Sequence, residues 1–414
     1  MTKNDTVLER FLRYVQIDTQ SDPASDTFPS TEKQKDLARV LAAELLELGL
    51  EDAHMDAFGY VYATLPGNTT RTNIPVICFC AHMDTSPDVT GANVRPVVHR
   101  NYQGGEIVLP DDPAQVIRPE DHPDLFAQIG NDIVTAGGTT LLGADNKAGV
   151  AAIMTAVSWL QADPSRKHGT IKILFTPDEE VGRGTEHVNL EKLGADYAYT
   201  VDGETLGSLE DETFSADSVL LEVFGVSTHP GFAFGKMENA IKIASDIVNA
   251  LPKNRLSPET TQDREGFLHP VRLEAQQEHA VLELIVRDFA EEGLKEKEAF
   301  LGGLVEDIMA RYTGSSYKMK VKAQYRNMGE ILAQHPQVVG YALKAMEKAG
   351  LTPIRRSIRG GTDGSRLSFM GLPCPNIFAG EHAFHSRQEW VSVQDMEKAA
   401  QVLVELAGVW ESEV

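Results

Sequence analysis

The chain of 414 residues exceeds the size at which one hydrophobic core usually stops growing, so two domains are expected. A composition of 42% hydrophobic and 24% charged residues is that of a globular protein and excludes a disordered or fibrous one. The 61 acidic residues outnumber the 38 basic ones, and the formal net charge of -23 disfavours nucleic acid and anionic membranes as partners.

The N-terminal segment and the cysteines favour a cytoplasmic protein. Charges interrupt the apolar positions of MTKNDTVLERFLRYVQIDTQ, so this segment lacks the apolar core of a secretory signal. No stretch approaches the roughly 20 apolar residues that span a bilayer, which excludes a membrane protein. Cys78, Cys80 and Cys374 lie in apolar segments and are too few for a disulfide scaffold, which fits a reducing compartment.

The first half of the chain alternates between helix and strand patterns. Leu37, Leu41, Leu45 and Leu48 recur at helical spacing after a segment rich in Ser and Thr, which predicts an N-capped amphipathic helix. Three strand-like runs and one helical run follow: 76–81, 171–176 and 198–201, and the helix 147–160. This alternation predicts an α/β fold, with a sheet packed between helices.

The pattern changes at about Ser218 to a smaller α+β unit. Strands are predicted at 218–227, 280–290 and 317–325, and helices at 236–251 and 296–312. After Arg326 the alternation of helix and strand returns, and the chain ends on the amphipathic helix 393–410. We therefore expect a discontinuous main domain, 1–215 plus 327–414, and an inserted domain, 216–326.

Five short polar motifs are expected at one edge of the sheet of the main domain. They are AHMDTS at 81–86, GADNKAG at 143–149, TPDEEVG at 176–182, TVDGE at 200–204 and HAFHS at 382–386. Crowded carboxylates repel one another unless cations lie between them, so together the motifs predict a metal site. Histidine and carboxylate ligands without thiolate suit zinc or a similar ion in a catalytic site, and two ions fit this number of ligands better than one. Such a pair activates water, and amide hydrolysis is its natural use.

The motifs AHMDTS, LLGADNKAGVA, TPDEEVGRG and VDGE resemble, in order and spacing, the metal-binding motifs of the M20 family of co-catalytic zinc peptidases. The segments YVQIDTQSDP, NYQGGEIVL, STHPG and IRGGTDGSRLSFMGLPCPNIFAG extend this resemblance to the tripeptide aminopeptidases of the family. The resemblance implies a zinc-peptidase-type mixed sheet between helices, with an inserted smaller lid domain that also serves for dimerisation in such enzymes. It implies short peptides, tripeptides in particular, as substrates, and two divalent ions per chain, Zn²⁺ first and Co²⁺ or Mn²⁺ as alternatives.

The resemblance also assigns the ligands of the two ions. Asp145 bridges both ions, with His82 and Asp202 completing one site. Glu180 and His385 complete the other site, so each ion has three protein ligands and keeps an open position. The Asp145–Asn146 peptide bond is expected to be cis, because the related peptidases use that form to aim the bridging carboxylate.

Further positions match residues with other roles in the family. Asp84 is expected to orient the His82 ring, and Glu179 is the expected general base, adjacent to the ligand Glu180. His229, in STHPG of the lid, is expected to donate a hydrogen bond to the developing oxyanion, in its own or a partner subunit.

Two arginines match the positions that bind the terminal carboxylate of the peptide. These residues, Arg287 and Arg359, carry a planar fork of donors suited to a carboxylate. The segments HPGFAFGKMENA and AGEHAFHS depart from the family pattern, so Phe232, Phe234 and Glu381 are expected to alter the walls of the substrate pocket.

Other activities of the M20 fold stay open as alternatives: N-acyl amino acid deacylase, dipeptidase and carboxypeptidase. The requirement for a free amino terminus separates the first of these, because tripeptides should turn over while N-acetylated ones resist. The products from one tripeptide separate an aminopeptidase from a carboxypeptidase. A catalytically inactive binding protein is disfavoured, because Glu179 and every expected metal ligand are present.

Overall fold

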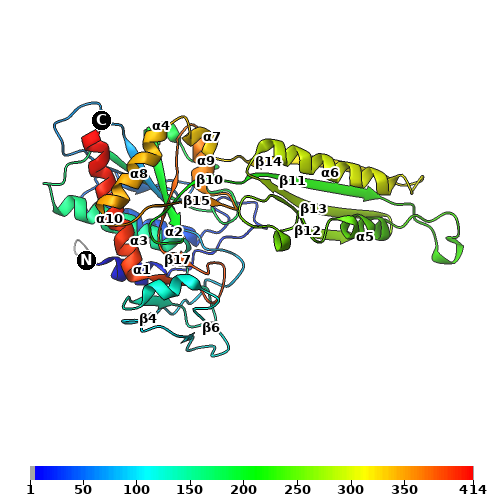
Figure 1. Ribbon diagram of the computed structural model, residues 1–414, viewed down its shortest axis with the longest axis horizontal. Helices are drawn as coiled ribbons and strands as arrows, with labels where there is room; N and C mark the ends of the chain where they lie inside the picture. The colour runs from blue at the N-terminus through cyan, green and yellow to red at the C-terminus, as the bar shows by residue number, and fades with distance from the viewer. Residues whose placement is uncertain (1–4, 414) are drawn as a thin grey trace. The chain divides into compact units, whose positions relative to one another are not determined.

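A computed structural model describes residues 5–413. The chain divides into two compact units (Figure 1). The first unit comprises Met1–Asp211, Glu330–Arg356 and Thr362–Val414, and the second comprises Glu212–Gly329 and Ser357–Gly361. The short segment Ser357–Gly361 thus stands with the second unit, whereas the sequence pattern had grouped it with the main domain.

The first unit is built on an eight-stranded mixed sheet, as the sequence and its resemblance predicted. The order of strands is β1-β2-β8-β3-β9-β16-β10-β15. Their bounds are His54–Met55, Val61–Leu65, Ile171–Thr176, Ile77–His82, Tyr197–Gly203, Asn376–Phe378, Ser208–Thr213 and Ile354–Ile358 in that order. Strands β8, β3, β9 and β16 are parallel to one another, so their carboxyl ends meet at one edge, and β2 and β10 flank this group as antiparallel strands.

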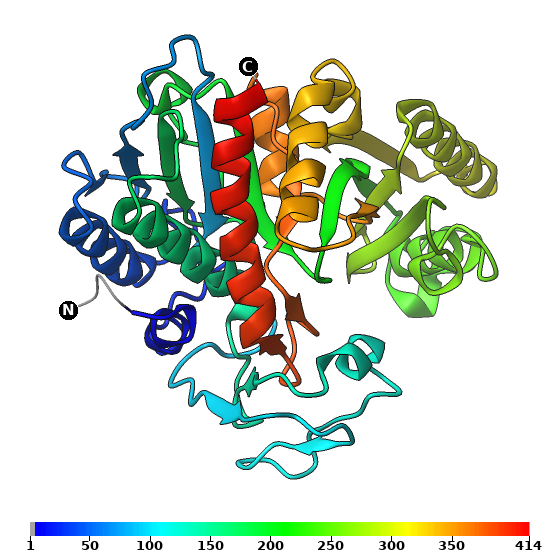
Figure 2. The ribbon, with the colours of Figure 1, turned by 60° about the vertical axis from the view of Figure 1, so that its left-hand side comes forward.

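Helices cover both faces of this sheet. They are α1 (Val7–Tyr14), α2 (Gln34–Glu47), α3 (Ala144–Ala162), α4 (Leu190–Leu193), α7 (Gly329–Leu332), α8 (Pro336–Lys348), α9 (Asp363–Phe369) and α10 (Val393–Glu413). Figure 2 shows α10 crossing one face with α8 beside it. Tyr199 of β9 points to that face, where its hydroxyl donates to the carbonyl of Val338 at 2.9 Å and accepts from Trp410 at 2.9 Å. Cys80 points to the opposite face and packs with Leu367 of α9.

Helix α2 differs from its prediction at the N-terminus. Its four predicted leucines are buried, but its N-cap residue is Lys33, which makes no side-chain cap. The preceding hydroxyls have other partners: Ser30 donates to the Asp178 carboxylate, and Thr31 donates to the carbonyl of Gln20 at 2.8 Å. The predicted Ser/Thr cap is therefore wrong, because these side chains hold the loop before the helix.

The first unit also contains a smaller sheet, a hairpin and a short helix. A four-stranded antiparallel sheet has the order β17-β18-β7-β4, with bounds Glu381–His382, Trp390–Ser392, Ile133–Thr135 and Val97–His99. The hairpin β5 (Ile107–Val108) and β6 (Val116–Ile117) and the 3₁₀ helix η1 (Pro123–Gln128) lie in the same part of the chain. Strands of two or three residues are too short for a sequence pattern to reveal.

The second unit is an antiparallel sheet, β12-β13-β11-β14, with helices on one face. Its elements are β11 (Ser215–Phe224), α5 (Ala240–Ala250), β12 (Phe267–Ala275), β13 (His279–Asp288), α6 (Glu291–Met309) and β14 (Ser316–Tyr325), with 3₁₀ helices η2 (Pro230–Phe232) and η3 (Pro258–Thr260). Leu221 and Leu282 are opposite in the register and pack with Ile243 of α5 and Leu301 of α6. Strand β12 was not predicted. It lies at the sheet edge, where its Pro270 is tolerated.

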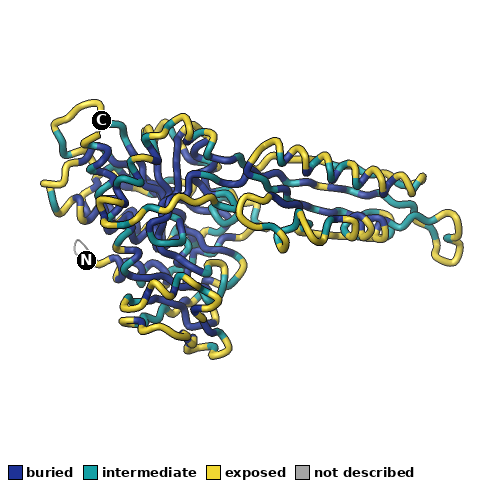
Figure 3. The backbone as a smooth tube through the Cα atoms, viewed as in Figure 1, coloured by how far each residue is buried: buried dark blue, intermediate teal, exposed yellow. Residues whose placement is uncertain are grey.

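Figure 3 shows that burial follows the architecture of each unit. In the first unit every residue of β3 is buried, and in the second unit most residues of β14 are exposed and the others are intermediate. Within residues 5–413, the helices are all too short or too polar to cross a membrane.

Candidate metal centre and active site

Three neighbouring strands bring the first site residues to one edge of the sheet. His82 is the last residue of β3, and Asp202 lies next to the last residue of β9. Glu179 and Glu180 lie shortly after the end of β8, at Thr176. Because β8, β3 and β9 are parallel neighbours, these residues leave the sheet side by side.

Five predicted ligand side chains lie together in two sets that share Asp145. His82 Nε2 is 2.9 Å from Asp145 Oδ1 and 3.4 Å from Asp202 Oδ1. His385 Nε2 is 3.2 Å from Asp145 Oδ2 and 2.8 Å from Glu180 Oε2. Asp145 thus presents one carboxylate oxygen to each histidine, which is the arrangement that a bridging ligand requires.

The backbone around Asp145 is held by a buried glutamate. Glu389 is 1% exposed, and its carboxylate accepts hydrogen bonds from the backbone N–H groups of Leu142 at 2.7 Å, Gly143 at 2.8 Å and Asp145 at 2.9 Å. Gly143 has φ of +82°, a conformation that favours glycine. The Asp145–Asn146 peptide bond is cis, so this prediction is confirmed.

Asp84 contacts two parts of the site. Its Oδ1 is 3.4 Å and its backbone carbonyl oxygen 3.1 Å from His82 Nδ1, so Asp84 lies where it can fix the ring. Its carboxylate also accepts the backbone N–H groups of Glu179 at 3.0 Å and Glu180 at 3.2 Å. Asp84 therefore ties the histidine at the end of β3 to the loop after β8.

Asp178 fixes the turn that leads from β8 to Glu179. It has φ of +58°, and its carboxylate accepts the N–H of Ser30 at 2.6 Å and the amide of Gln34 at 2.7 Å. Its own N–H donates to Gln34 Oε1 at 3.0 Å. The sequence reading did not assign a role to Asp178, although the aspartate stands inside the TPDEEVG motif.

The electrostatics of the cluster favour added positive charge. Burial alone would lower the pKa of His82, but the carboxylates of Asp202 and Asp145 outweigh it and raise that pKa well above its usual range. Burial opposes charge on His385 too, yet its hydrogen bonds to Asp145 and Glu180 raise its pKa to about 11. A site that draws protons onto its imidazoles attracts metal cations for the same reason.

Glu179 has the properties of a proton acceptor beside this cluster. Burial raises its pKa well above the usual range of a glutamate, and the nearby carboxylates of Asp363 and Asp202 raise it further, whereas His82 lowers it. A carboxylate with a raised pKa is suited to take a proton near neutral pH.

The described residues fit two divalent ions. Glu180 Oε1 is buried without a hydrogen-bond partner in the part of the chain described, so this oxygen is available to bind a metal ion. The donor set of two imidazoles and three carboxylates has no thiolate, which suits a catalytic pair of first-row ions. Close groups of possible ligand atoms are His82–Asp145–Glu180, Asp145–Asp202–Glu381 and Asp124–Glu204–His382.

His229 of the second unit is exposed and caps its own short helix. Its Nδ1 accepts the N–H of Gly231 at 3.1 Å at the start of η2. An imidazole whose Nδ1 accepts a hydrogen bond carries its proton on Nε2, so Nε2 is the donor that this ring offers. Phe232 and Phe234 beside it are exposed.

The two arginines of the second unit differ in how their donors are used. Arg359 donates to the backbone carbonyls of Asp263 at 2.8 Å, Glu265 at 3.0 Å and Thr261 at 3.3 Å. Among the described residues, Arg287 donates hydrogen bonds from Nη1, to the carbonyls of Asp217 at 3.3 Å and Val286 at 3.0 Å. Arg359 therefore holds a loop of its own unit, whereas Nη2 and Nε of Arg287 are the donors that can meet a ligand.

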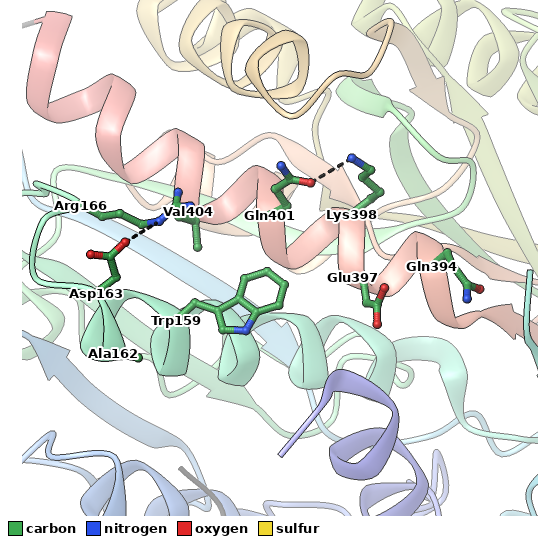
Figure 4. Close-up of a pocket in the computed structure, with 9 residues that line it drawn as sticks. All are labelled: Trp159, Ala162, Asp163, Arg166, Gln394, Glu397, Lys398, Gln401 and Val404. Carbon is green, nitrogen blue, oxygen red and sulfur yellow. Dashed lines mark hydrogen bonds and ion pairs between the residues drawn. The ribbon is translucent and has the colours of Figure 1, made fainter. Parts of the chain in front are cut away.

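A separate pocket lies on the first unit between α3 and α10 (Figure 4). Trp159, Ala162 and Gln401 are among its lining residues, and it includes none of the predicted site residues. Asp145 and Asn146 are not helical, and Trp159 is 12 positions after Lys147, which places it about 18 Å further along the regular part of α3 at 1.5 Å per residue. This pocket is thus distinct from the metal centre.

Comparisons with known proteins agree with this geometry. The model of the peptidase family M20/M25/M40 matches residues 141–408. Peptidase T of Desulfitobacterium hafniense strain Y51 is 46% identical over 408 residues, covering 99% of each chain, and peptidase T of Geobacillus thermodenitrificans is 46% identical over 405 residues, covering 98% of each. The crystal structure of aminopeptidase PepT from Bacillus cereus shares the fold, with a TM-score of 0.75 at 23% identity over 100% of both chains. A dinuclear metal-binding M20 peptidase from Bacillus subtilis has a TM-score of 0.65 at 15% identity and 97% coverage of both chains. The chain belongs to the peptidase family M20/M25/M40.

Proposed function

We propose that the protein is a two-metal aminopeptidase that releases the N-terminal residue from tripeptides. The observation that carries the proposal is the pair of ligand sets on Asp145, His82 with Asp202 and His385 with Glu180, beside a carboxylate of raised pKa. The tripeptide substrate follows from the relatives named peptidase T, which match this chain over nearly its whole length.

The ligands that we assign are His82, Asp145 and Asp202 for one ion and Glu180 and His385, with the shared Asp145, for the other. Divalent ions in such a set polarise a carbonyl oxygen and lower the pKa of a water. We assign Zn²⁺ to the two positions, since imidazole and carboxylate are the usual donors of catalytic zinc, with Co²⁺ and Mn²⁺ as the replacements to test. Asp84 keeps the His82 ring oriented through the Nδ1 side.

Glu179 is the general base in this proposal. It removes a proton from the attacking water and later delivers that proton to the leaving amine nitrogen. Its backbone N–H donates a hydrogen bond to Asp84, and the carboxylate of the preceding Asp178 accepts hydrogen bonds from Ser30 and Gln34. These bonds fix the backbone from which the Glu179 side chain projects, which supports its positioning for proton transfer.

His229 and Arg287 complete the proposal with groups from the second unit. The Nε2–H of His229 is the donor for the developing oxyanion, which its Nδ1 contact with Gly231 supports. Arg287 binds the terminal carboxylate with Nη2 and Nε, the donors that its backbone contacts do not use. Arg359 is the second arginine expected to bind the terminal carboxylate. Because its hydrogen bonds hold the 261–265 loop, we propose that it affects substrate binding by positioning that loop.

We also place the enzyme in the cytoplasm, where its free and buried cysteines, Cys78, Cys80 and Cys374, are stable. A homodimer is the proposed assembly, and light scattering of the purified protein measures it.

One assay tests the proposed function. Protein reconstituted with Zn²⁺, Co²⁺ or Mn²⁺ is given a tripeptide of three different residues, its N-acetylated form and an N-acetyl amino acid. The proposal expects a free amino acid from the first position plus a dipeptide, and no turnover of either acetylated compound. Release of the last residue would identify a carboxypeptidase, and turnover of the N-acetyl amino acid would identify a deacylase. Either result would contradict the proposal.

A further inference from the structure

A buried carboxylate outside the five assigned ligands lies beside the metal centre. Glu381 is 2% exposed and stands on β17, where it pairs with Val391 of β18. Sequence reasoning grouped it with Phe232 and Phe234 as a residue of the pocket wall. Its burial sets it apart from those two phenylalanines, which are exposed.

The backbone fixes Glu381 relative to Asp202. The N–H groups of Ala379 and Gly380 donate to the carbonyl oxygen of Gly203 at 2.7 Å and 3.1 Å. Gly203 directly follows Asp202 at the end of β9. Gly380 directly precedes Glu381, so the contact with β9 lies next to Glu381 in the chain, and the pairing with β18 holds Glu381 as well.

The Glu381 side chain points into the cluster of Asp145 and Asp202. One oxygen of each of these three carboxylates lies within 4.8 Å of the others. Glu381 Oε2 is buried and has no hydrogen-bond partner within the described residues. His82 contacts Asp145 at 2.9 Å and Asp202 at 3.4 Å, so the two carboxylates that lie near Glu381 share one imidazole.

This arrangement has the charge and the spacing of a cation site. A buried carboxylate that lacks a partner is unfavourable unless a cation or a proton neutralises it. Oxygen atoms bound to one ion at about 2.2 Å lie at most about 4.4 Å apart. The three oxygens, within 4.8 Å of one another, need only a small movement to share an ion.

We propose that Glu381 is an additional metal ligand, next to His82, Asp145 and Asp202; the inference rests on the proposed function. This side of the centre then offers one nitrogen and three carboxylates. The other side offers the nitrogen of His385 and two carboxylates, Glu180 and the shared Asp145. The two positions are therefore unequal. The position with Glu381 is more anionic and richer in oxygen, so it should bind its ion more tightly. Because Mn²⁺ prefers oxygen ligands, Glu381 should increase the affinity for Mn²⁺ more than the affinity for Zn²⁺.

Calorimetric titration of the metal-free full chain with Zn²⁺, and separately with Mn²⁺, tests the inference. The wild-type protein should bind two ions. Glu381→Gln keeps the shape and removes the charge, so one of the two ions should bind at least about 10-fold more weakly, with a larger loss for Mn²⁺. Glu381→Asp keeps the charge on a shorter side chain and should give a loss of intermediate size.

Glu210→Gln is the matched control for this titration. Glu210 is 6% exposed on β10 of the eight-stranded sheet, and its two carboxylate oxygens already accept hydrogen bonds, from Ser208 at 3.2 Å and from Asn376 at 2.8 Å. Its variant should bind both ions as the wild type does. Thermal unfolding adds a second readout: without metal, Glu381→Gln should be at least as stable as the wild type, and metal should raise its Tm less. A lower Tm of metal-free Glu381→Gln would indicate a purely structural role and overturn the inference.

Two more results would overturn the inference, and one would overturn the proposed function instead. Wild-type affinities for both ions in Glu381→Gln would show that Glu381 is no ligand. Unchanged metal binding with a raised KM for tripeptides would assign Glu381 to the amino group of the substrate. If the wild-type protein binds fewer than two ions, or binds two and leaves tripeptides intact, the proposed function fails.

Discussion

The two units of the molecule hold their candidate residues in different ways. In the first unit, His82 and His385 both contact the carboxylate of Asp145, and the buried Glu389 fixes the backbone of Asp145. In the second unit, His229 is exposed on a short helix and Arg359 is bonded to its own loop. The proposed metal ligands are thus held in place by their own unit, whereas the proposed roles of the second-unit residues depend on the substrate that they would contact.

This difference teaches which variants should affect metal binding and which should affect substrate binding alone. Loss of a proposed metal ligand in the first unit changes a cluster of coupled charges, so metal content and rate should change together. Loss of a donor in the second unit leaves that cluster intact, so metal content should stay and only kinetics should change.

Metal removal should give the largest effect. Chelation should reduce tripeptide hydrolysis to background, because the proposed mechanism needs divalent ions to activate the water and to neutralise the carboxylates around Asp145. Hydrogen exchange should become faster in the loops 142–145 and 178–181 of the first unit. It should stay unchanged in β11 and β13 of the second unit. Equal acceleration in both units would break the comparison, and added Zn²⁺ should restore both the rate and the exchange protection.

Glu179→Gln should give the next largest effect. It preserves shape and leaves metal content near two ions, but it removes a base that contributes about 10²- to 10⁴-fold to kcat. Glu180→Gln is the matched neighbour, since Glu180 Oε2 lies 2.8 Å from His385 in the ligand set. That variant should lose metal first and recover part of its activity in excess Zn²⁺ or Co²⁺. Rescue of Glu179→Gln by metal would show that Glu179 is a ligand and not the base.

His229→Ala should lower kcat about 10²- to 10³-fold, the usual range for loss of one oxyanion donor. Its metal content should equal that of the wild type, which separates it from variants of the proposed metal ligands. His279→Ala is the control, because His279 lies in the same unit and contacts Glu222 on the surface of the sheet. Steady-state kinetics and metal analysis of both variants give the answer. A loss of metal in His229→Ala would contradict the division between the units.

Arg287→Ala and Arg359→Ala should give the smallest effects, and of different kinds. Arg287→Ala should lose about 10- to 100-fold in kcat/KM on tripeptides with a free carboxylate, the value of about 1.5 to 3 kcal/mol for a hydrogen bond to a charged group. It should lose little on tripeptide amides. Arg359→Ala should instead lower the free energy of unfolding by about 1 to 2 kcal/mol, since it deletes the bonds to the 261–265 loop. If Arg359→Ala alone abolished the preference for a free carboxylate, the two roles would be reversed.

The sequence predicted the part of the site that short motifs carry. His82, Glu180 and Asp202 lie at or just after strand ends, and parallel pairing brings strand ends to one edge whatever the rest of the chain does. The helices with regular leucine spacing were also predictable, because a buried face repeats with the helical period.

The supporting residues could not be predicted in the same way. Glu389 and Glu381 look like ordinary acidic residues in the sequence, and only the folded chain shows that each is almost fully buried. The one available signal for Glu389 is its place directly before the buried strand Trp390–Ser392, where a surface acid is not expected. Arg359 illustrates the converse: its motif predicts a ligand contact, while its neighbours in space, the 261–265 loop, are about 95 positions away in the chain.

Anomalous diffraction from crystals of the zinc-reconstituted protein tests the central claim most directly. The account predicts two zinc peaks on either side of Asp145, one next to His82 and Asp202 and one next to Glu180 and His385, about 3.5 to 4 Å apart. A single peak, or two peaks that do not share Asp145 as a ligand, would contradict it.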